Sequence, residues 1–365
     1  MKKIIFLLLS IVLFTASCQK EKKNSFDGYE INGYVKNIPD STLVQILVNN
    51  KVIDSTIVIG EKFKLIGKVE KPTNVFLMTK KSRDINFKPF WLENSKIDFY
   101  AEKGNFIESK IIGSKTQEEA NILDKRVLPY KKEFDSLNKI LSNKSLDEVY
   151  RDSIITKFND VRKKKLDINR VFIREYPNSL VSSQTLNLYK TTFGKETTKE
   201  LFSLIDKNLH ETADGKAIMK FIELSKKLNI GDKFLDFEQE NLNGQKIKFS
   251  NIQKKYTLIE FWASWCIPCR KSNPELVKEY VKYKDKGFEI IGVSLDQKRN
   301  NWLKAIEKDG LVWENVSDLK GNENEVALMY GVNEIPDNFL IDENGKIIAR
   351  GLRNEDLKNK LEELF

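Results

Sequence analysis

The sequence is poor in the residue types that build metal sites and disulfide frameworks. Its 365 residues include three cysteines and a single histidine, His210. A metal site built on histidine needs several imidazoles, so we interpret His210 as a structural or surface residue. Cys266 and Cys269 lie close together and the third cysteine is Cys18, which leaves no thiols for a structural disulfide framework. Chemistry that requires two neighbouring thiols therefore has one place to occur.

The sequence also lacks an apolar run long enough to cross a membrane. The apolar stretch near the N-terminus, Ile4–Phe14, is far shorter than the about 20 residues that a spanning helix needs. It follows the basic segment Met1–Lys3 and precedes the small residues Thr15–Ser17, which is the pattern of a secretory signal. We therefore predict a signal peptide over residues 1–17 and export of the protein.

Residues Phe14–Cys18 resemble a bacterial lipobox, although Thr15 stands where an aliphatic residue is usual. The resemblance implies that Cys18 becomes the N-terminal residue and carries lipid chains, which would attach the protein to a membrane by burying CH₂ groups. The polar residues 18–25 would then form a tether. We expect a lipoprotein of the cell envelope that faces the periplasm.

Basic residues are in excess and give a net charge of +9, but they are interleaved with acidic residues almost everywhere. The densest basic run, Arg162–Lys165, lies in a helical pattern between Asp160 and Asp167, which favours a solvated helix face. No nucleic-acid-binding motif accompanies the excess charge. We therefore expect no nucleic-acid partner.

Residues 26–115 alternate apolar and polar side chains over short runs that turn residues separate. Short strands at this spacing predict an antiparallel β-sandwich or barrel. The region contains no catalytic constellation, and binding of a partner is the alternative to a purely structural role. Three segments carry a family resemblance: Val52–Thr56, Phe63–Val69 and Phe90–Asn94. They resemble a β-rich domain of unknown function that often precedes thioredoxin domains in Bacteroidetes lipoproteins.

Residues 116–229 change to a helical period. Apolar residues between Tyr130 and Leu141 recur at the spacing of one helix face, and similar patterns follow. We expect Pro129 and the segment Tyr176–Ser179 to interrupt these helices. The region is predicted to form a helical layer between its neighbouring domains, with dimerisation through an apolar face as the alternative.

Residues 230–365 show the order strand, helix, strand, helix, hairpin, helix. The apolar run Leu258–Trp262 leads into a turn with two cysteines and then into a helical pattern. Six segments of this region carry a family resemblance: Trp262–Arg270, Ser294–Asp296, Val316–Leu319, Tyr330–Val332, Ile335–Pro336 and Phe339–Lys346. They resemble TlpA/ResA-like thiol–disulfide oxidoreductases, an AhpC/TSA-related group of the thioredoxin superfamily. The resemblance implies a C-terminal thioredoxin-like α/β domain and thus a multidomain α+β protein.

A C-x-x-C pair serves either thiol redox chemistry or zinc binding. A structural zinc site needs four ligands, and the sequence offers neither a second cysteine pair nor a histidine near this one. We therefore expect redox chemistry without a metal or a cofactor. Cys266 should lie exposed at a helix N-terminus, where the positive helix end favours the attacking thiolate. Cys269, one turn later and more buried, should resolve the mixed disulfide.

Glu260 interrupts the apolar strand six residues before Cys266. Thioredoxins have a buried carboxylate at that spacing, and burial would raise the pKa of Glu260 so that it accepts the proton of Cys269. The alternative is a strand residue that faces solvent. ResA-like proteins often carry a glutamate where Ser272 stands here, so we expect Glu260 to have taken over the acid function.

The resemblance also implies residues that bind substrate. Pro336 is expected to follow a cis peptide bond and to face the cysteine pair, where the neighbouring backbone would pair with an extended substrate. Ile335 resembles the residue that precedes this proline in reducing thioredoxins. Trp265 is expected to shield the site. Asp337 stands where threonine is common. A carboxylate there would disfavour a thiolate at Cys266 and would select basic substrates.

These features predict an envelope oxidoreductase that reduces protein disulfides. As the family implies, a membrane thiol carrier would donate electrons, and the substrates would be protein thiols and disulfides such as those of apocytochrome c. Three alternatives stay open. A disulfide oxidase or isomerase differs in reduction potential. A thioredoxin-like peroxidase is disfavoured because Ile259 and Ala263 stand where peroxiredoxins need proline and threonine. A non-enzymatic envelope-binding module would depend on the β-rich domain.

Overall fold

The computed structural model of the chain describes residues 27–143 and 145–365. The chain forms two compact units, one that ends at Glu118 and one that consists of Glu119–Phe365. The predicted signal peptide, tether and lipidated Cys18 lie outside the described residues. Within the described ranges, no helix is both long enough and apolar enough to span a membrane.

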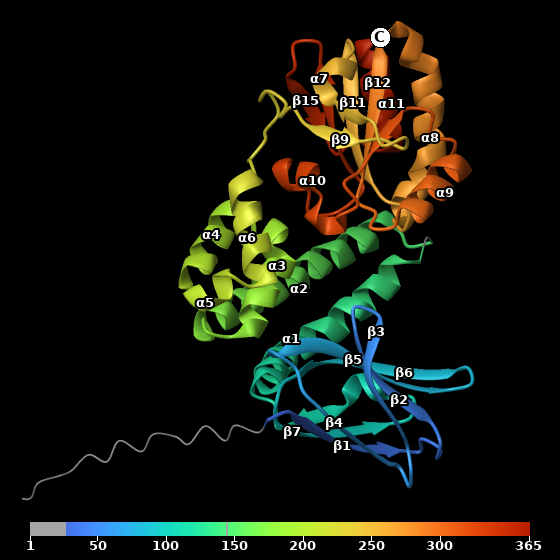
Figure 1. Cartoon of the computed structure of the whole chain (residues 1–365). Helices are drawn as coiled ribbons and strands as arrows, with labels where there is room; N and C mark the ends of the chain where they lie inside the picture. The colour runs from blue at the N-terminus through green and yellow to red at the C-terminus, as the bar shows by residue number, and fades with distance from the viewer. Residues whose placement is uncertain (1–26, 144) are drawn as a thin grey trace, which may run out of the picture. The chain divides into compact units, whose positions relative to one another are not determined.

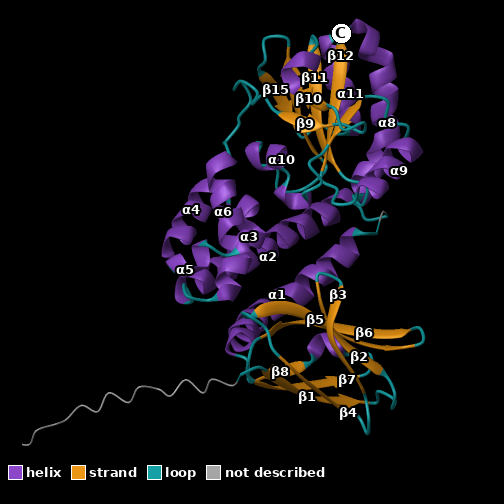
Figure 2. Cartoon of the chain, in the orientation of Figure 1, coloured by secondary structure: helices purple, strands orange, loops and turns teal. Residues whose placement is uncertain are grey.

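The first unit contains two four-stranded sheets, with the strand orders β4-β1-β7-β8 and β3-β2-β5-β6 (Figure 1, Figure 2). Ile31 and Phe99 of the first sheet and Val44 and Leu77 of the second belong to one hydrophobic core. The β-rich character is thus confirmed, and neither sheet closes into a barrel in the part of the chain described. The strands are β1 (Tyr29–Lys36), β2 (Leu43–Val48), β3 (Lys51–Ile57), β4 (Lys62–Gly67), β5 (Thr73–Lys81), β6 (Asp84–Leu92), β7 (Lys96–Glu102) and β8 (Lys110–Ile112).

One strand pair of this unit differs from the antiparallel prediction. β1 and β7 run parallel, with Ile31 opposite Ile97, whereas their outer neighbours β4 and β8 are antiparallel to them. Alternation of apolar and polar residues shows which face of a strand is buried, but it does not show which strand lies beside it. Parallel neighbours need a long crossover connection, and the chain between β1 and β7 provides one.

The predicted helical region is confirmed. Capping side chains mark several helix starts; for example, the carboxylate of Asp147 accepts a hydrogen bond from the main-chain N–H of Tyr150. His210 stacks on Phe202 with 4.0 Å between ring centroids, and its Nε2 lies 3.1 Å from the carbonyl oxygen of Ile205, which fits a structural role. The helices are α1 (Lys115–Leu141), α2 (Glu148–Glu175), α3 (Leu180–Phe193), α4 (Lys195–Leu204), α5 (Lys207–His210) and α6 (Ala213–Leu224).

Pro129 lies inside α1, so the predicted interruption there is wrong. A proline removes one main-chain hydrogen bond and costs about 3 kcal/mol in a helix interior. After Pro129 in α1, Phe134 and Leu137 pack against Ile154 and Val161 of α2, and the burial of these side chains offsets the loss. The predicted break at Tyr176–Ser179 does occur, between α2 and α3.

The C-terminal region forms a five-stranded sheet in the order β13-β12-β11-β14-β15, with the thioredoxin-like order of elements that was predicted. The central strand β11 pairs parallel with β12 and antiparallel with β14, and it is buried along almost its whole length. Helix α8 follows β11 and packs beside α9 and α11 (Figure 1). The elements are β9 (Glu238–Glu240), β10 (Lys246–Lys248), α7 (Phe249–Ile252), β11 (Tyr256–Trp262), α8 (Ile267–Tyr283), β12 (Phe288–Ser294), α9 (Arg299–Asp309), β13 (Glu314–Val316), α10 (Glu325–Met329), β14 (Asp337–Asp342), β15 (Ile347–Arg350) and α11 (Asn354–Leu364).

The helices of the second unit are attached to the C-terminal sheet region near α10. Nζ of Lys190 lies 2.5 Å from Oε1 of Glu323, and Nζ of Lys220 lies 2.6 Å from Oε1 of Glu325. Helix α6 also packs against α10. These contacts support the segment that leads from α10 into β14, which carries several predicted site residues.

Close packing around the end of β11 generates a first prediction. Nε1 of Trp262 donates a hydrogen bond of 3.1 Å to Oδ1 of Asn315, and a Cβ on Gly292 would lie 2.3 Å from that oxygen. Gly292→Ala should therefore destabilise the protein by about 1–3 kcal/mol, because the core cannot accept the added atom. Urea unfolding followed by tryptophan fluorescence measures the change.

A double-mutant cycle tests the cause of this loss. Asn315→Ala removes the oxygen that the new methyl group would strike. The substitution should therefore cost less in the Gly292→Ala background than in the unmodified protein. Additive costs would show that the contact between residues 292 and 315 does not limit the packing.

Candidate active site

The two predicted cysteines lie where β11 gives way to α8. Cys266 is the N-cap residue of α8, and its Sγ accepts a hydrogen bond of 3.2 Å from the main-chain N–H of Cys269. The two residues form a disulfide, with 5.3 Å between their Cα atoms. The free main-chain N–H groups of a helix N-terminus favour negative charge, so a thiolate formed here is stabilised by its position.

Cys266 is less accessible than the sequence predicted. In the disulfide form Cys266 is 4% exposed and Cys269 is 1% exposed, so the expectation of an exposed Cys266 sulfur is wrong. The physical reason is that Sγ of Cys266 turns toward the first turn of α8, where it meets the N–H of Cys269. The flanking side chains Trp265 and Ile267 are 57% and 68% exposed. Exposed apolar side chains therefore flank a recessed disulfide.

Two polar networks hold the loop that precedes Cys266. The buried carboxylate of Asp296 accepts hydrogen bonds from the main-chain N–H of Ser264 at 2.8 Å and from its hydroxyl at 2.5 Å. Arg270 donates from Nη1 to the carbonyl oxygen of Ser264 at 3.0 Å and pairs through Nε and Nη2 with Asp309. Asp296 lies in a segment that the family resemblance had marked, whereas nothing in the sequence had indicated the pairing of Arg270 with Asp309.

The peptide bond Ile335–Pro336 is cis, as predicted. Phe261 of β11 lies opposite Asp337, the first residue of β14, and Pro336 directly precedes that strand. Pro336 thereby lies at the end of the sheet from which the cysteine loop leaves. The side chains of the Ile335–Pro336 pair are half-buried.

Glu260 is buried, so the alternative of a solvent-facing strand residue is wrong. Its side chain is 8% exposed. Oε2 of Glu260 accepts a hydrogen bond of 2.8 Å from Nδ2 of Asn338, and Nη1 of Arg353 lies 3.4 and 3.5 Å from the two carboxylate oxygens. Burial raises the pKa of Glu260 to about 7, and the charge of Arg353 and the bond from Asn338 oppose this rise only in part. Glu260 can therefore take up or release a proton near neutral pH.

The sequence did not reveal the partners of Glu260. Asn338 and Arg353 lie 78 and 93 residues further along the chain. Helical or strand spacing cannot connect residues so far apart, and Arg353 lies in an irregular segment just before α11. The one available signal was that Asn338 interrupts the apolar run of β14.

Asp337 has a partner that the sequence also did not reveal. Nη2 of Arg350 lies 2.7 Å from Oδ2 of Asp337, and the guanidinium of Arg350 lies over the ring of Phe339 at 4.5 Å. The charge of Asp337 is thus balanced in part within the fold. Ser272 stands where the family resemblance implies a glutamate. Its hydroxyl donates a hydrogen bond of 2.9 Å to the carbonyl oxygen of Pro268 in the same helix.

Metal binding has no support in the described ranges. Across residues 27–143 and 145–365, no group of three His, Cys, Asp or Glu side chains is arranged to hold a metal ion. The second unit combines the two cysteines with a buried carboxylate on the adjoining strand.

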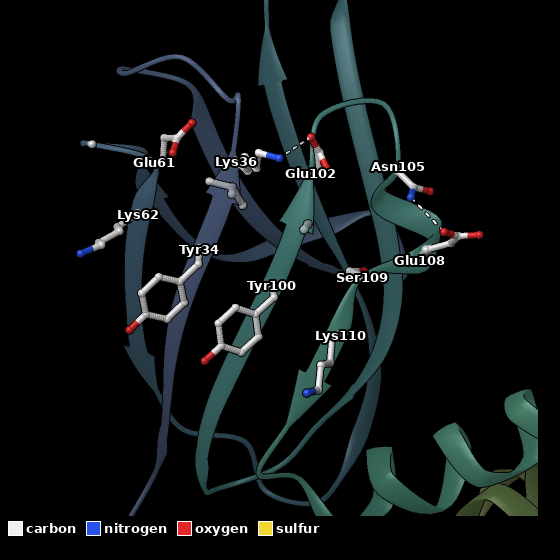
Figure 3. A pocket seen from close by; sticks show the side chains of 13 residues that line it. Tyr34, Lys36, Glu61, Lys62, Tyr100, Glu102, Asn105, Glu108, Ser109 and Lys110 are labelled. Atoms are coloured by element: carbon white, nitrogen blue, oxygen red, sulfur yellow. Dashed lines mark hydrogen bonds and ion pairs between the residues drawn. The ribbon is translucent and has the colours of Figure 1, made fainter.

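The first unit carries a separate cavity of about 520 Å³ on the sheet that contains β1 and β7 (Figure 3). Tyr34 and Tyr100 lie opposite each other on these strands and stack with 5.0 Å between ring centroids. Nζ of Lys36 forms an ion pair of 3.1 Å with Glu102 at the other side of the cavity. The volume is that of a small-molecule site. Its lining of tyrosine, lysine and glutamate suits binding of a polar ligand better than catalysis.

Comparison with known proteins finds two family models that match separate parts of the chain. Residues 230–350 match the AhpC/TSA family, and residues 29–120 match a domain of unknown function, DUF4369. Among solved structures, the thioredoxin domain of a thiol–disulfide oxidoreductase from Bacteroides vulgatus is 37% identical and covers 38% of this chain and 99% of its own, with a TM-score of 0.36. A thiol–disulfide oxidoreductase from Bacteroides fragilis is 39% identical and covers 37% of this chain and 100% of its own, with a TM-score of 0.35.

Curated relatives define the activity class. The thiol–disulfide oxidoreductase ResA of Bacillus cereus is 33% identical over 143 residues, which are 39% of this chain and 80% of the relative. ResA of Geobacillus thermodenitrificans is 33% identical over 138 residues, which are 37% of this chain and 78% of the relative. With one third of the residues identical over most of such a relative, the chain is an oxidoreductase and belongs to the family of ResA-like thiol–disulfide oxidoreductases.

Proposed function

We propose that the chain is an envelope protein-disulfide reductase whose chemistry runs through Cys266 and Cys269. The observation that carries this proposal is the disulfide between these residues at the N-terminus of α8, in a chain of the thiol–disulfide oxidoreductase family. Thiol–disulfide exchange needs a thiolate that attacks and a second thiol within reach of the resulting mixed disulfide. A pair of cysteines one helical turn apart supplies both.

The reaction begins with the dithiol form of the protein. The Cys266 thiolate attacks one sulfur of a substrate disulfide, whose S–S bond breaks while a mixed disulfide forms. The second substrate sulfur leaves as a thiolate and takes a proton from solvent. Cys266 is the attacking residue because it is the N-cap of α8, where the positive end of the helix dipole stabilises a thiolate.

Cys269 then resolves the mixed disulfide. Its thiol gives a proton to the carboxylate of Glu260, and the new Cys269 thiolate attacks the sulfur of Cys266. The first substrate sulfur leaves as a thiolate. Two electrons have then passed to the substrate, and Cys266 and Cys269 share a disulfide. The nearly neutral pKa of Glu260 supports this role, because a proton acceptor works best when its pKa lies near the working pH.

The surface around the disulfide is proposed to bind an extended segment of the substrate. The apolar side chain of Trp265 is exposed, and the Ile335–Pro336 pair lies at the same end of the sheet. Asp337 is proposed to contribute to the selection of basic substrates, although its pairing with Arg350 reduces its net charge. Ile335 supports a reductase because it resembles the residue that precedes the proline in reducing thioredoxins.

The setting of the reaction is proposed from the N-terminal sequence. A signal peptide over residues 1–17 and lipidation of Cys18 would place the protein in the envelope, facing the periplasm. A membrane thiol carrier would return the disulfide to the dithiol form, and apocytochrome c or misoxidised envelope proteins would be substrates. We also propose that the two sheets of the first unit form a β-sandwich, because side chains of both contribute to one core.

Trapping of substrates in cells tests the function. Cys269→Ser leaves the attacking thiol but removes the resolving one, so mixed disulfides between Cys266 and envelope proteins should accumulate. Non-reducing gels and mass spectrometry identify the captured proteins. The unmodified protein should be recovered mainly as the dithiol if it acts as a reductase.

Cys266→Ser is the matched control for this experiment. It should capture no protein, because the attacking thiol is missing. A Cys266→Ser strain that behaves like the wild type would favour a binding module over an enzyme. Recovery of the unmodified protein mainly as the disulfide would favour an oxidase.

Substitution of Glu260 tests the proton acceptor. Glu260→Gln keeps the shape of the side chain and its bond to Asn338 but cannot accept a proton. Resolution by Cys269 should slow by about 10²-fold, the usual contribution of a positioned base. A single turnover with one equivalent of 5,5′-dithiobis(2-nitrobenzoate) measures it, since attack by Cys266 and resolution by Cys269 each release one coloured thiolate. Equal rates of the second thiolate release in Glu260→Gln and the unmodified protein would rule out this role.

The raised pKa of Glu260 also predicts how stability depends on pH. The folded protein binds this proton more tightly than the unfolded chain, whose ordinary value is 4.5. The resulting stabilisation is fully present below pH 4.5 and is lost as the pH rises through about 7. Between pH 5 and pH 8 the free energy of unfolding of the disulfide form should therefore fall by about 2 kcal/mol more than that of the Glu260→Gln variant. Urea unfolding at the two pH values measures the difference, and parallel changes in the two proteins would contradict it.

A further inference from the structure

Glu260 is part of a hydrogen-bonded network that joins β11, β14 and the segment after β15. Asn338 donates from Nδ2 to Glu260 at 2.8 Å and to the carbonyl oxygen of Leu352 at 2.9 Å. Oδ1 of Asn338 accepts a hydrogen bond of 3.0 Å from the main-chain N–H of Leu352. The amide of Asn338 therefore fixes the segment that carries Arg353 in relation to the carboxylate of Glu260.

Arg353 brings a positive charge to the buried carboxylate. Its Nη1 lies 3.4 Å from Oε1 and 3.5 Å from Oε2 of Glu260, and the same Nη1 donates to the carbonyl oxygen of Leu352 at 3.0 Å. A guanidinium that bonds to its own segment through the nitrogen that faces the carboxylate has a restricted position. The pair is largely sheltered from water, so its attraction is screened less than that of a surface ion pair.

Several acidic groups lie around Glu260, and cations other than Arg353 act on them. Glu275 and Glu279 of α8 line a cavity of about 20 Å³ together with Glu260 and Arg353. Glu279 is 6% exposed, and its Oε2 has no hydrogen-bond partner among the described residues. Asp337 of β14 also acts on Glu260 by charge repulsion. Lys278 pairs with Glu275, Lys358 acts on Glu279, and Arg350 pairs with Asp337. Arg353 is the cation that acts on the Glu260 carboxylate itself.

We propose that Arg353 is a positioning residue for the exchange reaction: it keeps Glu260 ionised and oriented to receive the proton of Cys269, and without its charge the resolving step is confined to higher pH. This inference rests on the proposed role of Glu260 as the proton acceptor. Arg353 itself touches neither the sulfur atoms nor the substrate in this mechanism. It acts through Glu260, because only an ionised carboxylate can take up the proton that leaves Cys269.

The chemical step is the proton transfer within resolution. The Cys269 S–H bond breaks as the O–H bond on Glu260 forms, and the thiolate then attacks Cys266. If Glu260 is already protonated, this transfer has no acceptor. The rate of resolution therefore follows the fraction of ionised Glu260, and a neighbouring positive charge raises this fraction at a given pH.

The experiment compares the pH dependence of resolution in four forms of the full chain: unmodified, Arg353→Gln, Arg353→Lys and Arg174→Gln. All carry Cys18→Ser so that only the C-x-x-C thiols react. Each reduced protein is mixed with one equivalent of 5,5′-dithiobis(2-nitrobenzoate), and the second release of coloured thiolate is followed by stopped-flow absorbance. Arg174→Gln is the matched control, since it removes a positive charge that pairs with Glu200 between α2 and α4.

In Arg353→Gln the midpoint of the second phase should move upward by about one pH unit or more, the usual effect of an opposite charge at this distance. The limiting rate at high pH should remain that of the unmodified protein, and Arg353→Lys should shift the midpoint less. Arg174→Gln should leave it in place. A further variant with Glu260→Gln and Arg353→Gln together should show no shift beyond that of Glu260→Gln alone.

Each other outcome counts against the inference. If Glu260→Gln resolves slowly but the pH midpoint of Arg353→Gln is unchanged, the role of Arg353 is overturned and the proposed function stands. A Glu260→Gln that resolves at the normal rate removes the proposed proton acceptor, and the inference with it. A rate in Arg353→Gln that is lower at every pH, without a shift, indicates damage to the fold and also overturns it.

A direct titration covers the case in which Arg353→Gln does not fold. The ¹³C shift of the Glu260 carboxyl is followed against pH in the disulfide forms of the unmodified protein and Arg353→Lys. Lysine keeps the charge but not the planar donor group, so the titration should move upward by a smaller amount. Coincident titration curves would overturn the inference.

Discussion

The burial of one carboxylate in the central strand is the constraint on which the active site depends. An ionised carboxylate loses water contacts when it is buried, and the free energy lost must be recovered from fixed partners. Glu260 recovers part of it from Asn338 and Arg353, which come from β14 and from the segment before α11. The buried carboxylate therefore requires the antiparallel strand beside β11 to be in place, because that strand supplies Asn338. Sheet pairing and the proposed proton transfer are linked through this single side chain.

A second set of interactions fixes the sulfur atoms and uses other elements. Asp296 follows β12 and Asp309 ends α9, and through Ser264 and Arg270 they hold the two sides of the loop that carries Cys266. Because these bonds do not involve the cysteines, the loop can keep its shape whether the thiols are joined or free. The disulfide exchange then changes one bond inside a framework that is already set. Such preorganisation avoids rearrangement of the chain during the reaction.

Sequence patterns predicted the local parts of this architecture and missed the parts made by contacts between distant segments. The apolar run of β11 and the cysteines after it identified the strand, the helix start and the two cysteines that form the disulfide, because each depends on neighbouring residues. The cis bond before Pro336 came only from the family resemblance. Periodicity does not report contacts between distant segments of the chain. It therefore missed the parallel pairing of β1 with β7, the tolerance of Pro129 inside α1 and the partner Arg353. The shielding of Cys266 was missed because the turn of its sulfur toward α8 is a feature of three-dimensional packing.

The division between local and distant residues has a consequence for how such a site is tuned. A change of one unit in a pKa corresponds to about 1.4 kcal/mol, which is close to the net value of a single hydrogen bond to a charged group. The bond from Asn338 to Glu260 or the charge of Arg353 is therefore sufficient to move the pKa of Glu260, the proposed proton acceptor, by about one unit without a change in the C-x-x-C motif. Two proteins with the same motif can thus resolve mixed disulfides in different pH ranges. The residues that decide between them lie in the hairpin and the segment after it, where the motif gives no information.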